Sequence, residues 1–358
     1  MCIRDRYKSI LKYSFVDDFA AVLGSLRKQI VLDLNDDGMR KDKVTALVIW
    51  LIDRYHIRVG SDQYAMENES YGLTTLKESH LTYIRGKKAE IPGKGEVTGR
   101  KKNELPKINA KMMFTGKSGK DWKLYIRHPE IVKLIEESGK VGGKDSVQDV
   151  FRYKDNNGKD FDIKAEHINE YLDKHMANRY TAKDFRTWAA SWKTAARLAM
   201  VSNFSEEFIE KLPQEHEESV EKSKNSGLPP YIIIEQKDRP SVYLKGTEAM
   251  AKLAEAKKIP GEGEKERMAT MLAVIDTVAA DLGNTRAVCR SSYIRPMFMN
   301  DWESGVFLER WGKEINRAKK IGGKEEFEKM SLDEVTALLY MKKYESEEFD
   351  DALGFENV

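Results

Sequence analysis

Tyr293 is the residue of this chain with the most distinctive potential chemistry. A tyrosine hydroxyl can attack a phosphodiester and form a covalent phosphoester. The attack places additional negative charge on the phosphate oxygens, so cations must hold the phosphate beside the nucleophile. Tyr293 is therefore a candidate nucleophile only if other segments of the chain supply those cations.

Three short segments supply suitable cations. Arg58 lies in the run Ile-Arg-Val-Gly, Lys117 in Gly-Lys-Ser-Gly-Lys, and Arg186 in Thr-Ala-Lys-Asp-Phe-Arg-Thr-Trp. Guanidinium groups are permanently charged, fork-shaped donors for phosphate oxygens. An ammonium group can lose its proton, so Lys117 could protonate a departing 5′-oxygen. Each cation alone would be better explained as a helix-end or surface residue, and only the joint occurrence indicates a site.

Composition places few limits on function. The chain has 358 residues, of which 41% are hydrophobic and 34% charged, which is typical of a soluble protein with a substantial core. No apolar run is long enough for a membrane span, and no apolar signal segment follows the start, so we expect a cytosolic protein. The two cysteines, Cys2 and Cys289, predict neither a disulfide framework nor a metal site, and we expect Cys289 to be buried.

Charge is unevenly distributed although the net charge is only +2. The segment 85–107 carries eight basic and three acidic residues, a net +5, among glycines and prolines. From Tyr344 onward there are six acids and no Lys or Arg. A basic loop suits the phosphate backbone of a nucleic acid, although such loops are often simply solvated.

Helical periodicity dominates the chain. Apolar residues repeat at three- and four-residue steps from Asp17 to the break at 35–38, and again along a second helix that ends just before Arg58. Thr181 and Asp184 form a capping-box pattern at the start of another helix. A further apolar stripe ends at Gly283, so Asn284 is expected just beyond a helix end. Segment 300–345 is again predicted to be helical.

Two segments have the residue pattern of β-strands. Apolar residues alternate on either side of Gly116–Lys120, which predicts a hairpin with Lys117 at its tip. Residues 151–163, with Asn156-Asn157-Gly158 at the centre, predict a second small hairpin. We therefore expect an α+β protein that is mostly helical, with a β-hairpin region at 71–127. Residues 223–262 are predicted to be an insertion or linker whose fold the sequence leaves open.

Taken together, these segments make the chain resemble the type IB DNA topoisomerases, of the compact bacterial and viral kind. The resemblance runs from about Phe19 to the C-terminal helices, and is densest in 57–80, 114–120, 181–188 and 282–296. It implies a helical catalytic domain with a small β-hairpin region, the layout shared with tyrosine recombinases. Residues 17–345 would be the catalytic unit of a C-shaped clamp, with 1–16 a residual N-terminal segment and 346–358 an acidic tail.

The resemblance assigns roles residue by residue. The family's two arginines fall on Arg58 and Arg186, its hairpin lysine on Lys117 and its nucleophile on Tyr293. One position departs from the viral and eukaryotic pattern, because Asn284 stands where a histidine is expected, as in similar bacterial members. An amide can donate a hydrogen bond to a phosphate oxygen but cannot be charged. Further DNA contacts are expected from Tyr64, Lys77, Asn169 and Lys183.

The implied function is relaxation of supercoiled double-stranded DNA through a 3′-phosphotyrosyl intermediate, without ATP, metal or other cofactor, by a monomer in the cytoplasm. If the source is bacterial the protein would be associated with the nucleoid, and a nuclear or virion location stays open. The first six residues, Met-Cys-Ile-Arg-Asp-Arg, resemble a translated sequencing adapter. The N-terminal β-domain that closes the family's clamp is also missing, so we expect the natural N-terminus to lie elsewhere.

Two other functions share these features. A tyrosine recombinase has the same catalytic layout but usually carries His-x-x-Arg where this chain has Lys183 and Arg186. A DNA-binding module that has lost catalysis would keep the basic residues, and the missing domain is the best argument for impaired activity. Covalent trapping on plain plasmid DNA distinguishes the three. The sequence does not indicate the source organism, any DNA sequence preference, or whether the chain acts without a clamp domain.

Overall fold

The computed structural model divides the described part of the chain into two compact units. The first comprises residues of Met1–Lys28, Lys183–Glu217 and Lys245–Val358, and the second comprises residues of Gln29–Ala182 and Glu218–Leu244. The structure describes residues 13, 15–84, 109–143, 145–176, 180–236, 239–261 and 263–353. The predicted basic loop at 85–107 and nearly all of segment 1–16 therefore lie outside the described residues.

Helices predominate in both units, and the strands that the structure describes form one three-stranded antiparallel sheet and two hairpins. The expected mostly helical α+β class is confirmed. Two helices, α2 (Val16–Leu34) and α8 (Glu206–Ser226), have several residues in each unit, and α7 (Ala182–Val201) has its first residue in the second unit and the rest in the first. In the described part of the chain, no helix is both long and apolar enough to cross a membrane.

The second unit is built around α3 (Lys41–Tyr55), whose apolar face is fully buried, as its periodicity predicted. This helix packs against α5 (Pro129–Gly139) and α6 (Ala165–Met176). The short α4 (Asp62–Asn68) buries no residue. Burial of the α3 face removes apolar surface from water and so supplies much of the stabilisation that holds the segment after it in place.

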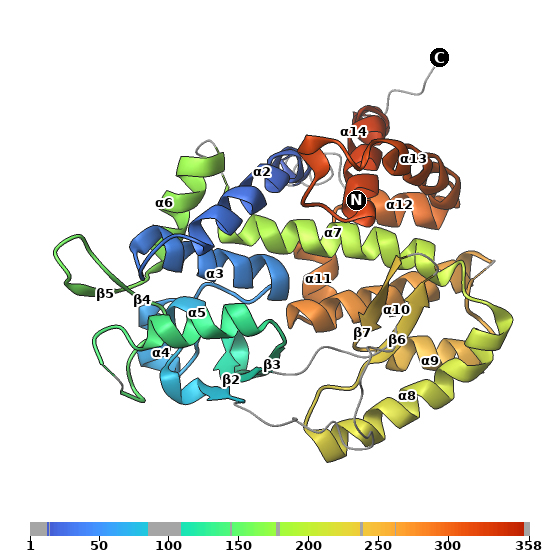
Figure 1. Cartoon of the computed structure of the whole chain (residues 1–358). Helices are drawn as coiled ribbons and strands as arrows, with labels where there is room; N and C mark the ends of the chain where they lie inside the picture. Colours follow the sequence, from blue (N-terminus) through green and yellow to red (C-terminus); the bar gives the residue numbers. More distant parts are fainter. Residues whose placement is uncertain are drawn as a thin grey trace, which may run out of the picture. The chain divides into compact units, whose positions relative to one another are not determined.

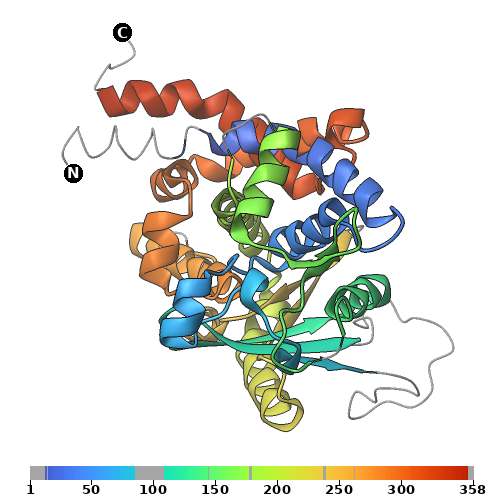
Figure 2. The ribbon, with the colours of Figure 1, turned by 90° about the vertical axis from the view of Figure 1, so that its left-hand side faces the viewer.

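The three-stranded sheet of this unit has the order β1-β2-β3 (Figure 2). It consists of β1 (Leu81–Tyr83), β2 (Ala110–Gly116) and β3 (Lys120–Ile126). Met112 pairs with Leu124 and Phe114 with Trp122, and Met112, Phe114 and Leu124 are buried. The predicted hairpin is thus confirmed, with the short 3-10 turn η3 (Lys117–Gly119) at its tip.

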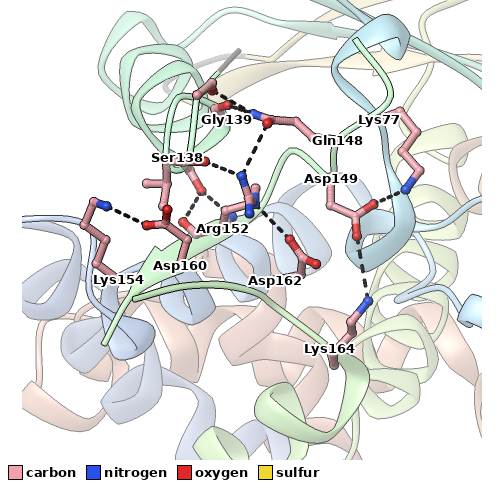
Figure 3. A network of polar contacts seen from close by, with 12 residues as sticks. Lys77, Ser138, Gly139, Gln148, Asp149, Arg152, Lys154, Asp160, Asp162 and Lys164 are labelled. Carbon is pink, nitrogen blue, oxygen red and sulfur yellow. Dashed lines mark hydrogen bonds and ion pairs between the residues drawn. The ribbon is translucent and has the colours of Figure 1, made fainter. Parts of the chain in front are cut away.

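A polar network in the same unit connects the sheet region to the second hairpin (Figure 3). That hairpin pairs β4 (Arg152–Lys154) with β5 (Asp160–Asp162), as predicted for 151–163. Arg152 is central, because its Nε donates to Asp162 at 2.9 Å while its backbone exchanges two hydrogen bonds with the Ser138 hydroxyl.

Asp149 accepts from Lys77 at 2.6 Å and pairs with Lys164 at 3.7 Å. The network adds ion pairs to the apolar packing of the neighbouring Leu76, which is fully buried. Two 3-10 turns, η1 (Leu73–Thr75) and η2 (Glu78–His80), flank Lys77.

The first unit consists of helices. The long helix α7 (Ala182–Val201) begins where the capping pattern at Thr181 predicted (Figure 1). An aromatic core containing Phe298, Phe307, Trp311 and Tyr340 joins three of the helices. The helices that follow residue 263 are α10 (Glu264–Leu282), α11 (Arg286–Ser292), α12 (Pro296–Ser304), α13 (Phe307–Ile321) and α14 (Leu332–Leu353), with the 3-10 turn η4 (Glu325–Phe327) between the last two.

The segment 223–262, left open by the sequence, contains regular structure. It holds the end of α8, the antiparallel pair β6 (Ile232–Gln236) and β7 (Arg239–Leu244), and α9 (Glu248–Glu255). Ile232, Ile234 and Leu244 bury their side chains, so the apolar run after Pro230 is a strand that packs on one face. At the other end of the chain, the backbone of α14 runs on to Leu353, into the segment expected to be an acidic tail.

Candidate active site

The sequence-predicted catalytic residues fall into two sets, one in each unit. Arg186, Asn284 and Tyr293 belong to the first unit, and Arg58 and Lys117 to the second. Each set is described by its own geometry. Side-chain contacts bring together residues far apart in sequence in the first set, and backbone hydrogen bonds do so in the second.

Arg186 connects the three residues of the first set. It lies in the first turns of α7, where its side chain is only 3% exposed. Its Nη2 donates to the carbonyl oxygen of Leu282 at 2.9 Å and to Oδ1 of Asn284 at 3.4 Å. Its guanidinium carbon also lies 5.1 Å from the ring centroid of Tyr293, the geometry of a cation–π contact. Arg186 therefore contacts both the candidate nucleophile and the candidate amide donor.

Asn284 is positioned by the end of α10. The helix stops at Gly283, whose φ of 62° lies in the left-handed region that glycine adopts without strain. The Asn284 backbone N–H then donates to the carbonyl of Ala279 at 2.8 Å, which closes the turn. Because Oδ1 of Asn284 accepts from Arg186, the Nδ2 group is the donor of this side chain. Donation from Nδ2 to a phosphate oxygen stays a prediction.

Tyr293 follows the short helix α11 and serves as its C-cap. The Thr285 hydroxyl caps the other end by accepting from the N–H of Val288 at 3.3 Å. The N–H of Tyr293 donates to the carbonyl of Cys289 at 3.1 Å. Cys289 is fully buried, as expected, and burial raises the pKa of its thiol to about 12. The thiol one turn before the nucleophile is therefore a packing residue that stays protonated at neutral pH.

Two residues that the sequence did not single out fix the backbone on either side of Ile294. Ser191 of α7 is fully buried, and its hydroxyl accepts from the N–H of Arg295 at 3.0 Å. Its one proton faces two acceptors, the carbonyl of Thr187 at 2.8 Å and that of Tyr293 at 3.3 Å. The Arg295 side chain, 1% exposed, pairs with Asp17 of α2 at 3.4 Å and Glu345 of α14 at 3.2 Å. In the sequence, the one hint of a role for Ser191 was its place on the same predicted helix as Arg186, five residues further along.

In the second set, Arg58 lies just after α3, which ends at His56 with φ of 58°. A short segment joins the Arg58 backbone to the hairpin. Leu73 N–H donates to the carbonyl of Arg58 at 3.0 Å, and Tyr71 N–H donates to the carbonyl of Thr115 at 2.8 Å. Segment 71–74 therefore fixes the backbone of Arg58 relative to the strand that leads into Lys117. Lys117 itself is exposed at the tip.

Close backbone packing explains two glycines of this region. A Cβ at Gly72 would lie 2.4 Å from the backbone nitrogen of Gly60 and 2.7 Å from the carbonyl oxygen of Arg58. Gly60 itself adopts a φ of 112°, which side-chain-bearing residues rarely accept. The close approach of the two segments thus depends on the absence of side chains at both positions.

Lys120, at the start of β3, is a further cation in this region that the sequence reasoning passed over. Burial lowers the pKa of its ammonium, and the positive charge of Arg58 lowers it further. The two cations are therefore close enough to repel each other. A signal was present in the sequence, because Lys120 belongs to the same Gly-Lys-Ser-Gly-Lys run as Lys117.

The predicted DNA contacts have different surroundings. Tyr64 on α4 is 57% exposed, and Asn169 and Lys183 are exposed on α6 and α7. Lys77 is part of the polar network, because its ammonium pairs with Asp149 (Figure 3). Its contact with DNA stays a prediction, and the ion pair is a competing role. Among the described residues, no group of three His, Cys, Asp or Glu side chains is arranged to hold a metal ion.

Comparison with known proteins provides independent evidence of the family to which the chain belongs. The family model of the catalytic core of eukaryotic DNA topoisomerase I matches residues 5–303. A protein of Acanthamoeba polyphaga mimivirus named DNA topoisomerase 1B is 27% identical over 180 residues, which is 50% of this chain and 47% of that protein. The DNA topoisomerase 1 of Mycosarcoma maydis is 27% identical over 188 residues, 48% of this chain and 16% of that protein. The matched region thus spans about half or less of these relatives.

Proposed function

Because the chain belongs to the family defined by the catalytic core of eukaryotic DNA topoisomerase I, we propose that it is a type IB enzyme that relaxes supercoiled DNA by cutting and rejoining one strand. The observation that carries the proposal is the contact of Arg186 with both Tyr293 and Asn284. A nucleophile, a permanent cation and an amide donor are thereby gathered from three separate segments. Packing alone does not require this combination in a buried position.

In the proposed reaction the Tyr293 hydroxyl attacks a backbone phosphorus. A bond forms between the tyrosine oxygen and phosphorus, and the bond to the 5′-oxygen of the next nucleotide breaks. The tyrosine loses its proton, the departing oxygen gains one, and the strand is left with a 3′-phosphotyrosyl link and a free 5′-hydroxyl. Rejoining is the same step in reverse, so the energy of the phosphodiester is conserved and no ATP is needed.

The other residues act on the same phosphodiester. Arg58 and Arg186 would stabilise the charge that develops on the equatorial oxygens, since guanidinium forks match phosphate oxygens. Asn284 would donate from Nδ2 to a non-bridging oxygen. Lys117, an ammonium at an exposed hairpin tip, would deliver the proton to the 5′-oxygen.

Plasmid relaxation is the first test of the proposal. Both positively and negatively supercoiled plasmids should relax without ATP and in excess EDTA, because every group in the proposed step is a side chain of the chain itself. Loss of relaxation in EDTA would contradict the proposal. The Tyr293→Phe variant, which lacks only the reacting hydroxyl, is the matched control and should leave both plasmids supercoiled.

Covalent trapping separates the proposal from its alternatives. Denaturing the reaction with SDS should leave protein attached to plain plasmid DNA, and labelled DNA should show that the attached end is the 3′ side of the break. Adducts confined to one defined site would indicate a recombinase. Binding without any adduct would indicate a module that has lost catalysis, and a 5′ attachment would refute the assigned polarity.

DNA binding should depend on the phosphate backbone. We expect Lys and Arg of segment 85–107 to contact phosphates rather than bases, together with Tyr64, Lys77, Asn169 and Lys183. Such contacts release counterions, so affinity should fall steeply between about 50 and 200 mM salt. An affinity for duplex DNA that does not change with salt would count against this mode of binding. We expect a monomer to carry out these steps, which sedimentation with and without duplex DNA will check.

A further inference from the structure

The last turn of α10 is held on α7 by a buried ionic cluster. Asp281 of α10 accepts from Lys193 Nζ at 2.9 Å and from Arg197 Nη2 at 2.6 Å, both on α7. The other terminal nitrogen of Arg197 donates to the hydroxyl of Thr277 at 3.0 Å, one turn earlier on α10. The side chains of Lys193, Arg197 and Asp281 are 16%, 6% and 11% exposed. We call these three residues the Asp281 cluster.

The cluster is ionic rather than neutral. Burial raises the pKa of the Asp281 carboxyl, but the charges of Arg197 and Lys193 outweigh burial and leave it well below its usual range. Burial lowers the pKa of Lys193, and Asp281 opposes that change. A buried charge that loses its partner is strongly destabilising, so removing the carboxylate should disturb both cations.

The backbone that leaves the cluster leads directly into the candidate active site. Leu282 follows Asp281, and its carbonyl accepts from Arg186. Gly283 then turns the chain, and Asn284 accepts from the same guanidinium. The three cations Arg186, Lys193 and Arg197 all come from α7. Their spacing places them on one face of that helix. One helix face thus carries both the reactive cation and the two cations that fix α10.

From this geometry we propose that Asp281 is a positioning residue for strand cleavage, which holds the Leu282 carbonyl and Asn284 in place against Arg186. Asp281 does not touch the phosphate and acts through Lys193 and Arg197. The expected effects on the rate of strand cleavage rest on the proposed function. The structural part of the proposal, the fixation of the α10 end on α7, stands on the contacts of Asp281 alone.

The test replaces Asp281 by asparagine, which keeps the shape and removes the charge. A displacement of about 1 Å can cost about 100-fold in rate, so we expect the single-turnover cleavage rate of Asp281→Asn to fall by roughly 10- to 100-fold. Affinity for duplex DNA should change less than about 2-fold, because no phosphate contact is removed. The matched control is Glu314→Gln in α13, a buried acid paired with Lys343 at 3.0 Å. It should lower the melting temperature but leave cleavage unchanged.

Coupling to Arg186 distinguishes positioning from general loss of stability. If Asp281 acts by holding the Leu282 carbonyl and Asn284 against Arg186, Asp281→Asn should add less than about 3-fold to the defect of Arg186→Ala, since residues that work as one unit are non-additive. A full, multiplicative effect in that background would overturn the proposal, as would wild-type cleavage by Asp281→Asn. Should Asp281→Asn fail to fold, Lys193→Gln keeps the Arg197 pair and should show a smaller slowing in the same direction. Wild-type cleavage by Lys193→Gln would then overturn the proposal.

Hydrogen exchange provides a readout that needs no activity. The amides of Gly283 and Asn284 should exchange at least about 10-fold faster in Asp281→Asn, and at the wild-type rate in Glu314→Gln. Unchanged exchange at both amides would overturn the positioning role. If the wild-type protein forms no covalent adduct, the proposed function fails, whereas the exchange experiment still decides whether Asp281 fixes the end of α10.

Discussion

The hydroxyl of Ser191 lies 3.3 Å from the backbone carbonyl of Tyr293 and shares its one proton between that carbonyl and the carbonyl of Thr187 at 2.8 Å. The same hydroxyl accepts from the N–H of Arg295 at 3.0 Å, so one oxygen fixes the chain on both sides of Ile294. Ser191 lies on α7, the helix that presents Arg186. One helix therefore both carries Arg186 and holds the backbone of Tyr293. This limits how far the candidate nucleophile and its neighbouring cation can move apart.

Ser191→Ala should slow cleavage while leaving the fold intact. The change removes the hydroxyl that contacts the nucleophile segment on both sides of Ile294 and leaves a buried N–H of Arg295 without this acceptor, at a typical cost of about 1–3 kcal/mol. We expect a 5- to 50-fold lower rate of covalent adduct formation, measured in single-turnover trapping. Thr194→Val is the matched control, because Thr194 is buried on the same helix and its hydroxyl bonds only within α7, to the carbonyl of Ala190. Equal rates for the two variants would contradict the assignment.

Asn284→Ala should reduce cleavage by about 100-fold or more, the usual effect of losing one donor to a developing oxyanion. Asn284→His should retain activity, because an imidazole can donate from the same place, and its rate should vary with pH near the ordinary histidine pKa of about 6.5. Trapping assays beside Tyr293→Phe, which should bind DNA but form no adduct, check both variants. An undiminished rate in Asn284→Ala would remove this residue from the site and leave the other assignments standing.

Gly72→Ala should destabilise the second unit. The added Cβ would meet backbone atoms of Gly60 and Arg58 at 2.4–2.7 Å, and backbone cannot yield as a side-chain end can. We expect a loss of about 1–3 kcal/mol in the free energy of unfolding, measured in urea. Cleavage by the folded fraction should also slow, since segment 71–74 would be pushed from the Arg58 backbone. Gly312→Ala, a helical site with nothing within 4 Å, is the control and should be neutral or stabilising.

Cys289 should resist alkylation in the folded protein across the alkaline range. With a pKa of about 12 its thiolate fraction at pH 10 is only about 1%, whereas an ordinary thiol is largely ionised there. Because the folded pKa lies above the unfolded value, the thiol's contribution to stability is complete below about pH 9 and declines as the pH rises toward 12. Mass spectrometry after iodoacetamide treatment, with Cys289→Ser to assign the label, checks this. Rapid native labelling at pH 8 would contradict it.

The sequence predicted the elements that carry the candidate residues because each has a strong local signal. The apolar stripe of α3, the alternation around Gly116 and the stop at Gly283 all depend on short-range geometry. Contacts between segments leave no such signal. That Arg186 is buried, with its guanidinium beside the Tyr293 ring, depends on how α7, α10 and α11 pack, and no spacing in the sequence specifies it.

The same reason explains the residues that were missed. Ser191 is an unremarkable polar position on an amphipathic helix, and Asp281 is one acid among many until Lys193 and Arg197 are seen against it. Lys77 illustrates the converse case. Its place in the motif predicted a phosphate contact, whereas the partner shown by the structure is Asp149, which is 72 residues away in the chain.

Arg295 has a practical consequence for protein engineering. Its buried guanidinium is balanced by Asp17 near the beginning of the described chain and by Glu345 near its end. Shortening the protein to remove α14, or splitting it into fragments between α2 and α7, would leave that charge beside the nucleophile poorly compensated. Expression boundaries, affinity tags and circular permutations that disturb either helix would therefore alter the surroundings of the candidate nucleophile, although they lie far from it in the sequence.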